Sequence, residues 1–247
     1  MKHLGQTVAD PATASAAEMV DALHAMISHP DFPCLGARSV FRRDRATVRI
    51  YQELGSPVCA AQLLDDLRQF ADQVDSDEGL ASFVALFRGP PIHSEQRFEE
   101  LLWAQLRAVH AHDPQPWAPD VSADPDDPHF AFSVAGTAYF VVGLHPAASR
   151  EARRAAVPTL VFNLHSQFEE LRASGAFPRM RDLIRARDEA LQGQVNPMVA
   201  DHGQSSEARQ YSGRAVSADW QAPFEADPGA PQSRTADADA NSPQGTR

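Results

Sequence analysis

Two histidines that end apolar runs are candidates for binding or catalysis. His145 ends the apolar run TAYFVVGLH, and His165 ends the run PTLVFNLH. Because side chains alternate along a strand, each imidazole is the polar end of a row facing one side of a sheet. If the strands run parallel, the twelve residues of 146–157 suffice for a short crossover, and both histidines emerge at one carboxyl edge, where ligands collect. An antiparallel pair would place them at opposite ends, with no joint site.

Three arginines follow the first of these runs closely. Arg150, Arg153 and Arg154 come within ten residues of His145, and a helical turn would put all three on one face. Such a face can clamp carboxylates or phosphates through charge-assisted hydrogen bonds. The alternative is a solvated helix face whose charges pair with the acidic surface of the protein.

The polar segment SSEARQYSGR (205–214) offers a second group of side chains suited to binding. It carries Glu207, Arg209, Tyr211 and Arg214 just beyond the last long helical pattern. A loop this rich in carboxylate and guanidinium groups favours ligand binding over packing. The sequence therefore predicts a pocket for an anionic or zwitterionic ligand.

Several familiar sites are absent from the sequence. It contains no HExxH zinc motif, Walker loop, GxGxxG fingerprint or GxSxG elbow. Its two cysteines, Cys34 and Cys59, exclude a disulfide framework and paired-cysteine zinc sites, and they suit a reducing compartment. His110 shares a helical face with Trp103 and Leu106 and is a third candidate histidine.

Charge and hydropathy limit the partners further. The chain has 33 acidic and 22 basic side chains, a net charge of −11 at pH 7, which argues against nucleic acid because phosphate contacts need a basic surface. No apolar run reaches the ~18 residues of a membrane span, and the first residues lack the apolar centre of a signal peptide. We expect a soluble, cytoplasmic bacterial protein without membrane partners.

Hydrophobic periodicity places these groups on an alternating series of strands and helices. Strands are predicted at 45–54, 80–91, 129–136, 137–146 and 158–165, and helices at 16–29, 57–74, 94–113, 166–175 and 178–193. This pattern predicts one mixed α/β domain at 15–225, with a central sheet of about five strands flanked by helices. The compositions of 1–14 and 226–247 predict disordered ends.

Six segments that carry these features resemble the YqcI/YcgG family of bacterial proteins. They are HPDFPCLGARSVFRR (29–43), FEELLWAQLRAVHAHD (98–113), FSVAGTAYFVVGLHPAASREARR (132–154), LVFNLHSQFEELRASG (160–175), IRARDEALQGQVNPM (184–198) and SEARQYSGR (206–214). Some members of that family are heme-dependent oxygenases that hydroxylate a guanidine nitrogen of arginine or an arginine-like amino acid. The resemblance thus implies a heme b, a guanidino amino acid as substrate and an electron donor. A non-catalytic heme or small-ligand binding protein is the alternative.

The resemblance also suggests a role for each candidate residue. A heme needs an axial ligand, apolar walls and cations for its two propionates. His145 is the first candidate for the axial ligand, and the rivals are His165, Cys34 and His110. Arg150, Arg153 and Arg154 would then neutralise the propionates.

A guanidinium substrate requires a carboxylate, because a bidentate charged pair holds that fork most strongly. Glu207 is the first candidate, and Asp188 and Asp113 are the alternatives. Arg209 or Arg214 would bind the carboxylate of the substrate, with Tyr211 as a further binding group.

Overall fold

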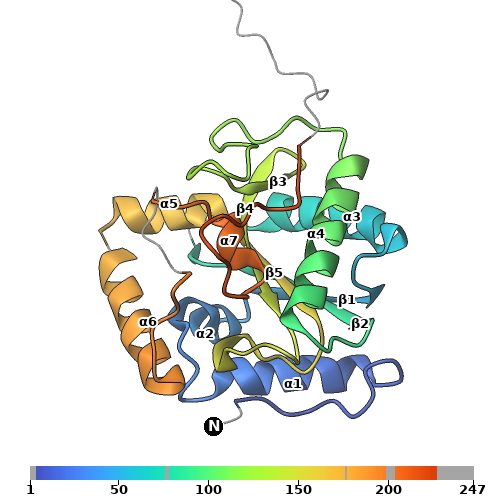
Figure 1. Cartoon of the computed structure of the whole chain (residues 1–247), viewed down its shortest axis with the longest axis vertical. Helices are drawn as coiled ribbons and strands as arrows, with labels where there is room; N and C mark the ends of the chain where they lie inside the picture. Colours follow the sequence, from blue (N-terminus) through green and yellow to red (C-terminus); the bar gives the residue numbers. More distant parts are fainter. Residues whose placement is uncertain (1–3, 76–77, 176, 199–203, 227–247) are drawn as a thin grey trace, which may run out of the picture.

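Five strands form one mixed sheet in the computed structural model of the chain, which describes residues 4–75, 78–175, 177–198 and 204–226 (Figure 1). The strand order is β1-β2-β5-β4-β3. The bounds are β1 Ala46–Glu53, β2 Ser82–Gly89, β3 Phe132–Val134, β4 Thr137–Leu144 and β5 Thr159–Leu164. This sheet confirms the predicted fold class.

Helices cover both faces of the sheet. They are α1 Ala16–Ser28, α2 Leu35–Arg42, α3 Pro57–Gln73, α4 Glu95–His112, α5 His165–Ala173, α6 Phe177–Gln192 and α7 Ala208–Tyr211, with a short 3₁₀ turn, η2, at Glu151–Arg153. Capping side chains mark the start of two of these helices: Ser15 and Glu18 form a capping box at α1, and Ser94 accepts the N–H of Arg97 at α4. Helix α2 is an element that periodicity did not predict.

The sheet contains both parallel and antiparallel pairs of strands. Strand β1 runs parallel to β2, whereas β5 runs antiparallel to both β2 and β4. Strands β3 and β4 form the predicted hairpin, which turns at Ala135 and Gly136, both with positive φ. Strand β2 lies second in the order and is buried from Ser82 to Phe87.

Alternating side chains of the strands build a separate core on each face. Phe83, Val141 and Phe162 pack with Leu67 of α3 and Trp103 of α4, while Val84 and Leu86 pack with α1 on the other face. Figure 1 shows α3 and α4 on the right of the view and α5 and α6 on the left. The region beside α5 and α6 holds the candidate site.

The ends of the chain are described only in part. We predicted disorder for 1–14, but residues 4–14 have defined contacts: Leu4 is buried, and Arg88 donates to the backbone oxygens of Pro11 and Ala14 at 3.1 and 2.6 Å. These contacts attach the segment to the domain. The predicted tail at 226–247 lies outside the described residues from 227 onward.

Candidate functional site

The two histidines that end the apolar runs lie far apart along the strands. In the antiparallel pair of β4 and β5, Tyr139 is opposite Leu164 and Leu144 is opposite Thr159. His145 and His165 are therefore at opposite ends, so of the two alternatives that the sequence left open the antiparallel one holds, and the two histidines form no joint site. The physical reason is the connection at 146–157, which reverses the chain through η2 instead of crossing over the sheet through a helix.

His145 is buried on the α4 side of the sheet. Its side chain is fully buried and stacks on Phe98, with ring centroids 4.2 Å apart. Neither ring nitrogen has a hydrogen-bond partner among the described residues. Burial, together with the nearby charges of Arg153 and Arg154, lowers the pKa of His145 to about 4. The imidazole is thus neutral at physiological pH.

A cavity of about 370 Å³ opens on the opposite side of the sheet. Its walls are mainly apolar and come from β4, β5, α2, α5 and α6; Phe140, Val142, Val161, Phe41, Phe168 and Ile184 contribute. Phe140 and Val142 face it because they alternate with Tyr139 and Val141, which point into the other core. His145 is not among the residues that line this cavity.

Helix α6 contributes one stripe of side chains to the cavity. Phe177, Met180, Arg181, Ile184 and Arg185 recur at helical spacing and all line the wall. The sequence showed this helix as amphipathic, but its apolar stripe could not reveal what it covers. None of its described residues is fully buried, because the cavity lies where a core would otherwise be.

Cys34 lines the same cavity at the start of α2. It is the N-cap residue, and its Sγ accepts the backbone N–H of Ala37 at 3.5 Å. Burial raises the pKa of the Cys34 thiol, while the N–H groups of Ala37 and Gly36 and the charge of Arg153 oppose that shift. The unpredicted helix α2 therefore supplies the polar surroundings of this sulfur.

His165 lines the cavity as well, at the first turn of α5. Its side chain is 10% exposed, and Nδ1 lies 3.9 Å from Oε1 of Glu169, one helical turn further on. Of the four candidate axial ligands, Cys34 and His165 reach the cavity. His110 instead packs against the rings of Trp117 and Phe224.

The three arginines do not lie on a helical face, because η2 replaces the expected helix and each guanidinium takes a different direction. Arg150 is 7% exposed, and its Nη2 lies 2.6 Å from Oδ2 of Asp188 on α6. Arg154 pairs with Glu151 at 2.7 Å.

Arg153 is held by backbone oxygens. Its two terminal nitrogens donate to Gly143 at 3.0 Å and to Gln210 at 3.3 Å, which ties the turn after β4 to α7. Arg150 and Arg153 line the cavity, and Arg154 does not. Two of the three predicted cations therefore lie beside this space.

Glu207 lines the cavity at the start of α7. Its Oε1 accepts a hydrogen bond of 2.6 Å from the hydroxyl of Tyr211. Burial raises the pKa of Glu207 to about 8, although this hydrogen bond and the charge of Arg172 lower it. The alternative carboxylates are engaged differently: Asp188 pairs with Arg150, and Asp113 accepts the backbone N–H of Ala135.

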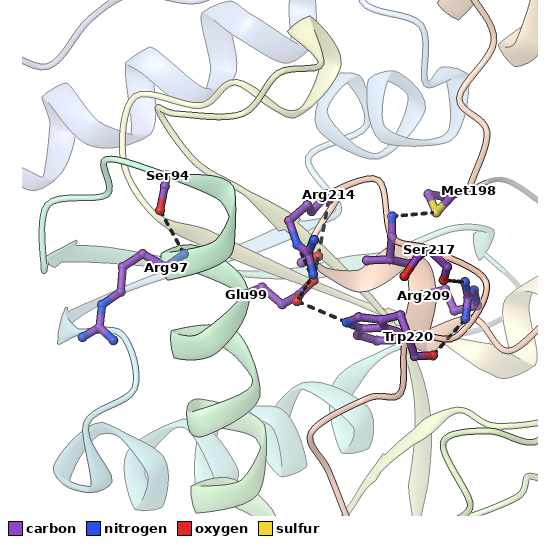
Figure 2. Close-up of polar contacts among 10 residues, drawn as sticks. Ser94, Arg97, Glu99, Met198, Arg209, Arg214, Ser217 and Trp220 are labelled. Carbon is purple, nitrogen blue, oxygen red and sulfur yellow. Dashed lines mark hydrogen bonds and ion pairs between the residues drawn. The ribbon is translucent and has the colours of Figure 1, made fainter.

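Arg209 and Arg214, the two arginines of the polar segment, are not among the residues that line this cavity, and Figure 2 shows the contacts that they make instead. Nη2 and Nε of Arg214 contact the two carboxylate oxygens of Glu99 at 2.5 and 3.2 Å. Arg209 donates to the backbone oxygens of Ser217 and Trp220. The role of substrate-carboxylate ligand that we predicted for them has no support in this geometry, because neither residue lines the cavity.

The described part of the chain shows no evident site for a metal ion bound directly by protein side chains. Among residues 4–75, 78–175, 177–198 and 204–226, no group of three or more His, Cys, Asp or Glu side chains converges. The cavity instead combines apolar walls, two possible axial ligands and cations. These features suit a planar apolar cofactor with anionic substituents, such as a heme.

Comparison with known proteins places this architecture in a family. The family model of YqcI/YcgG proteins matches residues 23–225, which includes the sheet, the cavity and α7. The chain belongs to the YqcI/YcgG family. It is 30% identical over 192 residues to the uncharacterized protein YcgG of Bacillus subtilis, covering 73% of this chain and 75% of that one.

A second family member is similarly related. The uncharacterized protein YqcI of Bacillus subtilis is 28% identical over 189 residues, covering 73% of this chain and 74% of its own. No solved structure matches the chain. In the part of this YqcI/YcgG protein that the structure describes, no helix combines the length and apolar character needed to cross a bilayer.

Proposed function

We propose that the cavity binds heme b and that the protein is a heme-dependent oxygenase, which hydroxylates a guanidino nitrogen of arginine or an arginine-like amino acid. The observation that carries this proposal is the convergence of Cys34, Arg153 and Glu207 on one mainly apolar cavity. A heme would supply the activation of oxygen, and the protein would supply binding, orientation and charge.

Cys34 is the axial ligand that the geometry favours. Only the thiolate form of cysteine binds iron well, and a helix N-terminus and a neighbouring arginine are the surroundings that stabilise a thiolate. Cys34 has both, since it caps α2 and lies within the field of Arg153, and these features oppose the rise in the pKa of its thiol that burial causes. His165 is the second candidate because it lines the same cavity. His145 falls behind both of them because it is packed against Phe98 instead.

Arg150 and Arg153 are suited to the propionates. Both residues line the cavity wall, and both guanidinium groups are anchored by the protein, that of Arg150 by Asp188 and that of Arg153 by backbone oxygens. Anchoring of this kind holds a cation in place before an anion arrives, so less side-chain freedom is lost on binding. In this proposal the two arginines position the cofactor and take no part in proton transfer.

Glu207 is suited to the guanidinium of the substrate. It is the cavity carboxyl whose hydrogen bond comes from a neutral tyrosine, whereas Asp188 is already paired with an arginine. A planar cation with several N–H donors can bind a carboxylate more strongly than a neutral group can. The buried carboxyl would thus select arginine-like side chains and hold the nitrogen that is to be oxidised.

The test is an absorption spectrum of the protein expressed with a heme precursor, recorded oxidised, reduced and reduced with carbon monoxide. We expect a Soret band in the wild type and its loss, or a shifted carbon monoxide band, in Cys34→Ser. Cys59→Ser is the matched control, because Cys59 is a buried cysteine of α3 in the opposite core. It should leave the spectrum unchanged.

Two results would contradict the proposal. If hemin reconstitution gives no Soret band, no heme is bound and the oxygenase proposal fails. If heme binds but arginine, a reductant and oxygen give no hydroxylated product, the protein is instead a heme-binding protein without this activity. A further result would change only the axial ligand: if His165→Ala rather than Cys34→Ser removes the Soret band, the ligand lies on α5.

A further inference from the structure

Tyr211 contacts Glu207, and packing and backbone contacts hold its hydroxyl in place. The ring is fully buried and stacks on Trp103, with centroids 5.7 Å apart. Its hydroxyl oxygen accepts the backbone N–H of Phe132 at 3.1 Å and lies 2.6 Å from Oε1 of Glu207. Packing and backbone contacts thus determine the position of this hydroxyl before any ligand enters.

These contacts determine where the phenolic proton points. A tyrosine hydroxyl has one proton to donate, and the N–H of Phe132 takes one of its acceptor positions. The remaining acceptors are Oε1 of Glu207 at 2.6 Å and the backbone oxygen of Tyr139 at 3.4 Å. The shorter contact takes the proton, so Oε1 of Glu207 is an acceptor and any proton on the carboxyl resides on Oε2.

The second oxygen of Glu207 is thereby left for the cavity. Oε2 makes no hydrogen bond to any residue that the structure describes, and Glu207 forms part of the cavity wall. We propose that Tyr211 is a positioning residue, which holds Oε1 of Glu207 so that Oε2 binds a cationic N–H group of the substrate and the carboxyl loses its proton on binding. This inference rests on the proposed function, since it concerns the guanidino site.

The charges around Glu207 support the loss of its proton when a cation binds. Tyr211 of α7 and Arg172 of α5 are the groups that act on its carboxyl, and both favour the ionised form, whereas burial opposes it and keeps the pKa at about 8. The other titratable or charged side chains of the wall are His129, His165, Cys34, Arg150, Arg153, Arg181, Arg185 and Asp188. A bound guanidinium replaces the lost hydration of the carboxylate, so one proton leaves to solvent for each cation bound.

The first experiment needs no ligand. The infrared C=O stretch of a protonated carboxyl is followed in pH titrations of the full chain, with Glu207→Gln to assign the signal. Tyr211→Phe should shift this titration to higher pH, because the ionised carboxylate loses its hydrogen bond. Tyr139→Phe is the matched control: that hydroxyl is also buried but donates to the backbone oxygen of Leu67, so the titration should stay in place.

The second experiment uses L-arginine and its uncharged isostere L-citrulline as probes in calorimetric titrations. Affinity for arginine should rise about tenfold between pH 6 and 7 and about fivefold between pH 7 and 8, as the ionised fraction of Glu207 grows towards one half. Affinity for citrulline should stay flat. At pH 7, Tyr211→Phe should weaken arginine binding roughly tenfold, and Glu207→Gln should abolish its pH dependence.

The outcomes separate this inference from the oxygenase proposal. Equal titrations of wild type and Tyr211→Phe would overturn the positioning role, whatever the heme content. Arginine that fails to bind, or that binds with the same pH dependence as citrulline, would overturn the cation site. If both experiments succeed and no hydroxylated product forms, the inference holds and the proposed reaction fails.

Discussion

His145 is a buried, neutral imidazole whose stacking partner is Phe98. Its position ends a strand on the side of α4, away from the cavity that holds Cys34 and Glu207. The sequence makes His145 a candidate site residue because it is a polar residue at the end of an apolar run. In the structure that polar residue is part of the packed core, so we expect its main effect to be on stability.

The pH dependence of stability tests this role. In the folded protein the pKa of His145 is about 4, against 6.5 for an ordinary histidine. Between these values the unfolded chain binds a proton that the folded chain excludes, so the free energy of unfolding falls as pH falls from 6.5 to 4. The loss should reach about 3 kcal/mol at pH 4.

His145→Leu removes this contribution. Urea unfolding of the variant at a series of pH values should show a smaller fall in the free energy of unfolding between pH 6.5 and 4 than in the wild type, with no loss of stability at pH 7. His93→Gln, a change at an exposed histidine, should show the same fall as the wild type. If His145→Leu also shows the wild-type fall, the imidazole is protonated in the folded protein and the burial argument is wrong.

At the scale of elements, Gly143 lets α4 and α7 approach strand β4. A Cβ at this position would lie 2.5 Å from a ring carbon of Phe98 and 2.8 Å from the backbone oxygen of Tyr211. Both neighbours are held by packing, so neither can move aside easily. The glycine therefore permits the contact that brings the Glu207–Tyr211 pair to the edge of the cavity.

Gly143→Ala should destabilise the protein by about 2 kcal/mol, because overpacking forces α4 or α7 away from the sheet. Denaturant unfolding measures this loss. Gly89→Ala, in a strand position where a Cβ would meet nothing within 4 Å, is the control and should change stability little. Equal stability of the two variants would show that α7 is not held tightly against β4.

At the scale of the whole molecule, the segment 204–226 packs over α4 and completes the core. Trp220 and Phe224 contact the ring of Trp103, and Arg214 reaches Glu99 across the chain. Glu99 is 6% exposed and also accepts from Trp220 at 3.3 Å. The Arg214 side chain is 27% exposed and that of Glu99 is 9% exposed, so the pair is mostly buried, and breaking it leaves an uncompensated charge that costs more than the pair itself contributes.

Glu99→Gln should therefore lower the free energy of unfolding by roughly 2 kcal/mol, because the Arg214 guanidinium would lose its counter-charge. Thermal and denaturant unfolding measure the effect. Glu100→Gln on the same helix is the matched control, since Glu100 pairs with Arg97 at 3.0 Å on the exposed surface. That pair should contribute less than about 1 kcal/mol. Equal losses in the two variants would argue against a buried ion pair.

Much of the architecture follows from sequence periodicity. Alternation at 137–146 and helical spacing at 57–74 and 94–113 predict elements that the structure confirms, because a side chain's place on a strand or helix depends on local backbone geometry alone. The composition of the polar segment containing Glu207 predicts a binding region, and Glu207 lines the cavity; its binding role stays a prediction.

Residue types and their spacing alone predict which residues share a face of each element and that the elements form one mixed α/β domain. The folded chain was needed to learn that β4 and β5 run antiparallel, that Cys34 and Glu207 line one cavity, and that His145 does not reach it. The physical reason is that strand direction and pairing depend on how a connection packs against distant elements. Local periodicity is the same for a strand that runs in either direction.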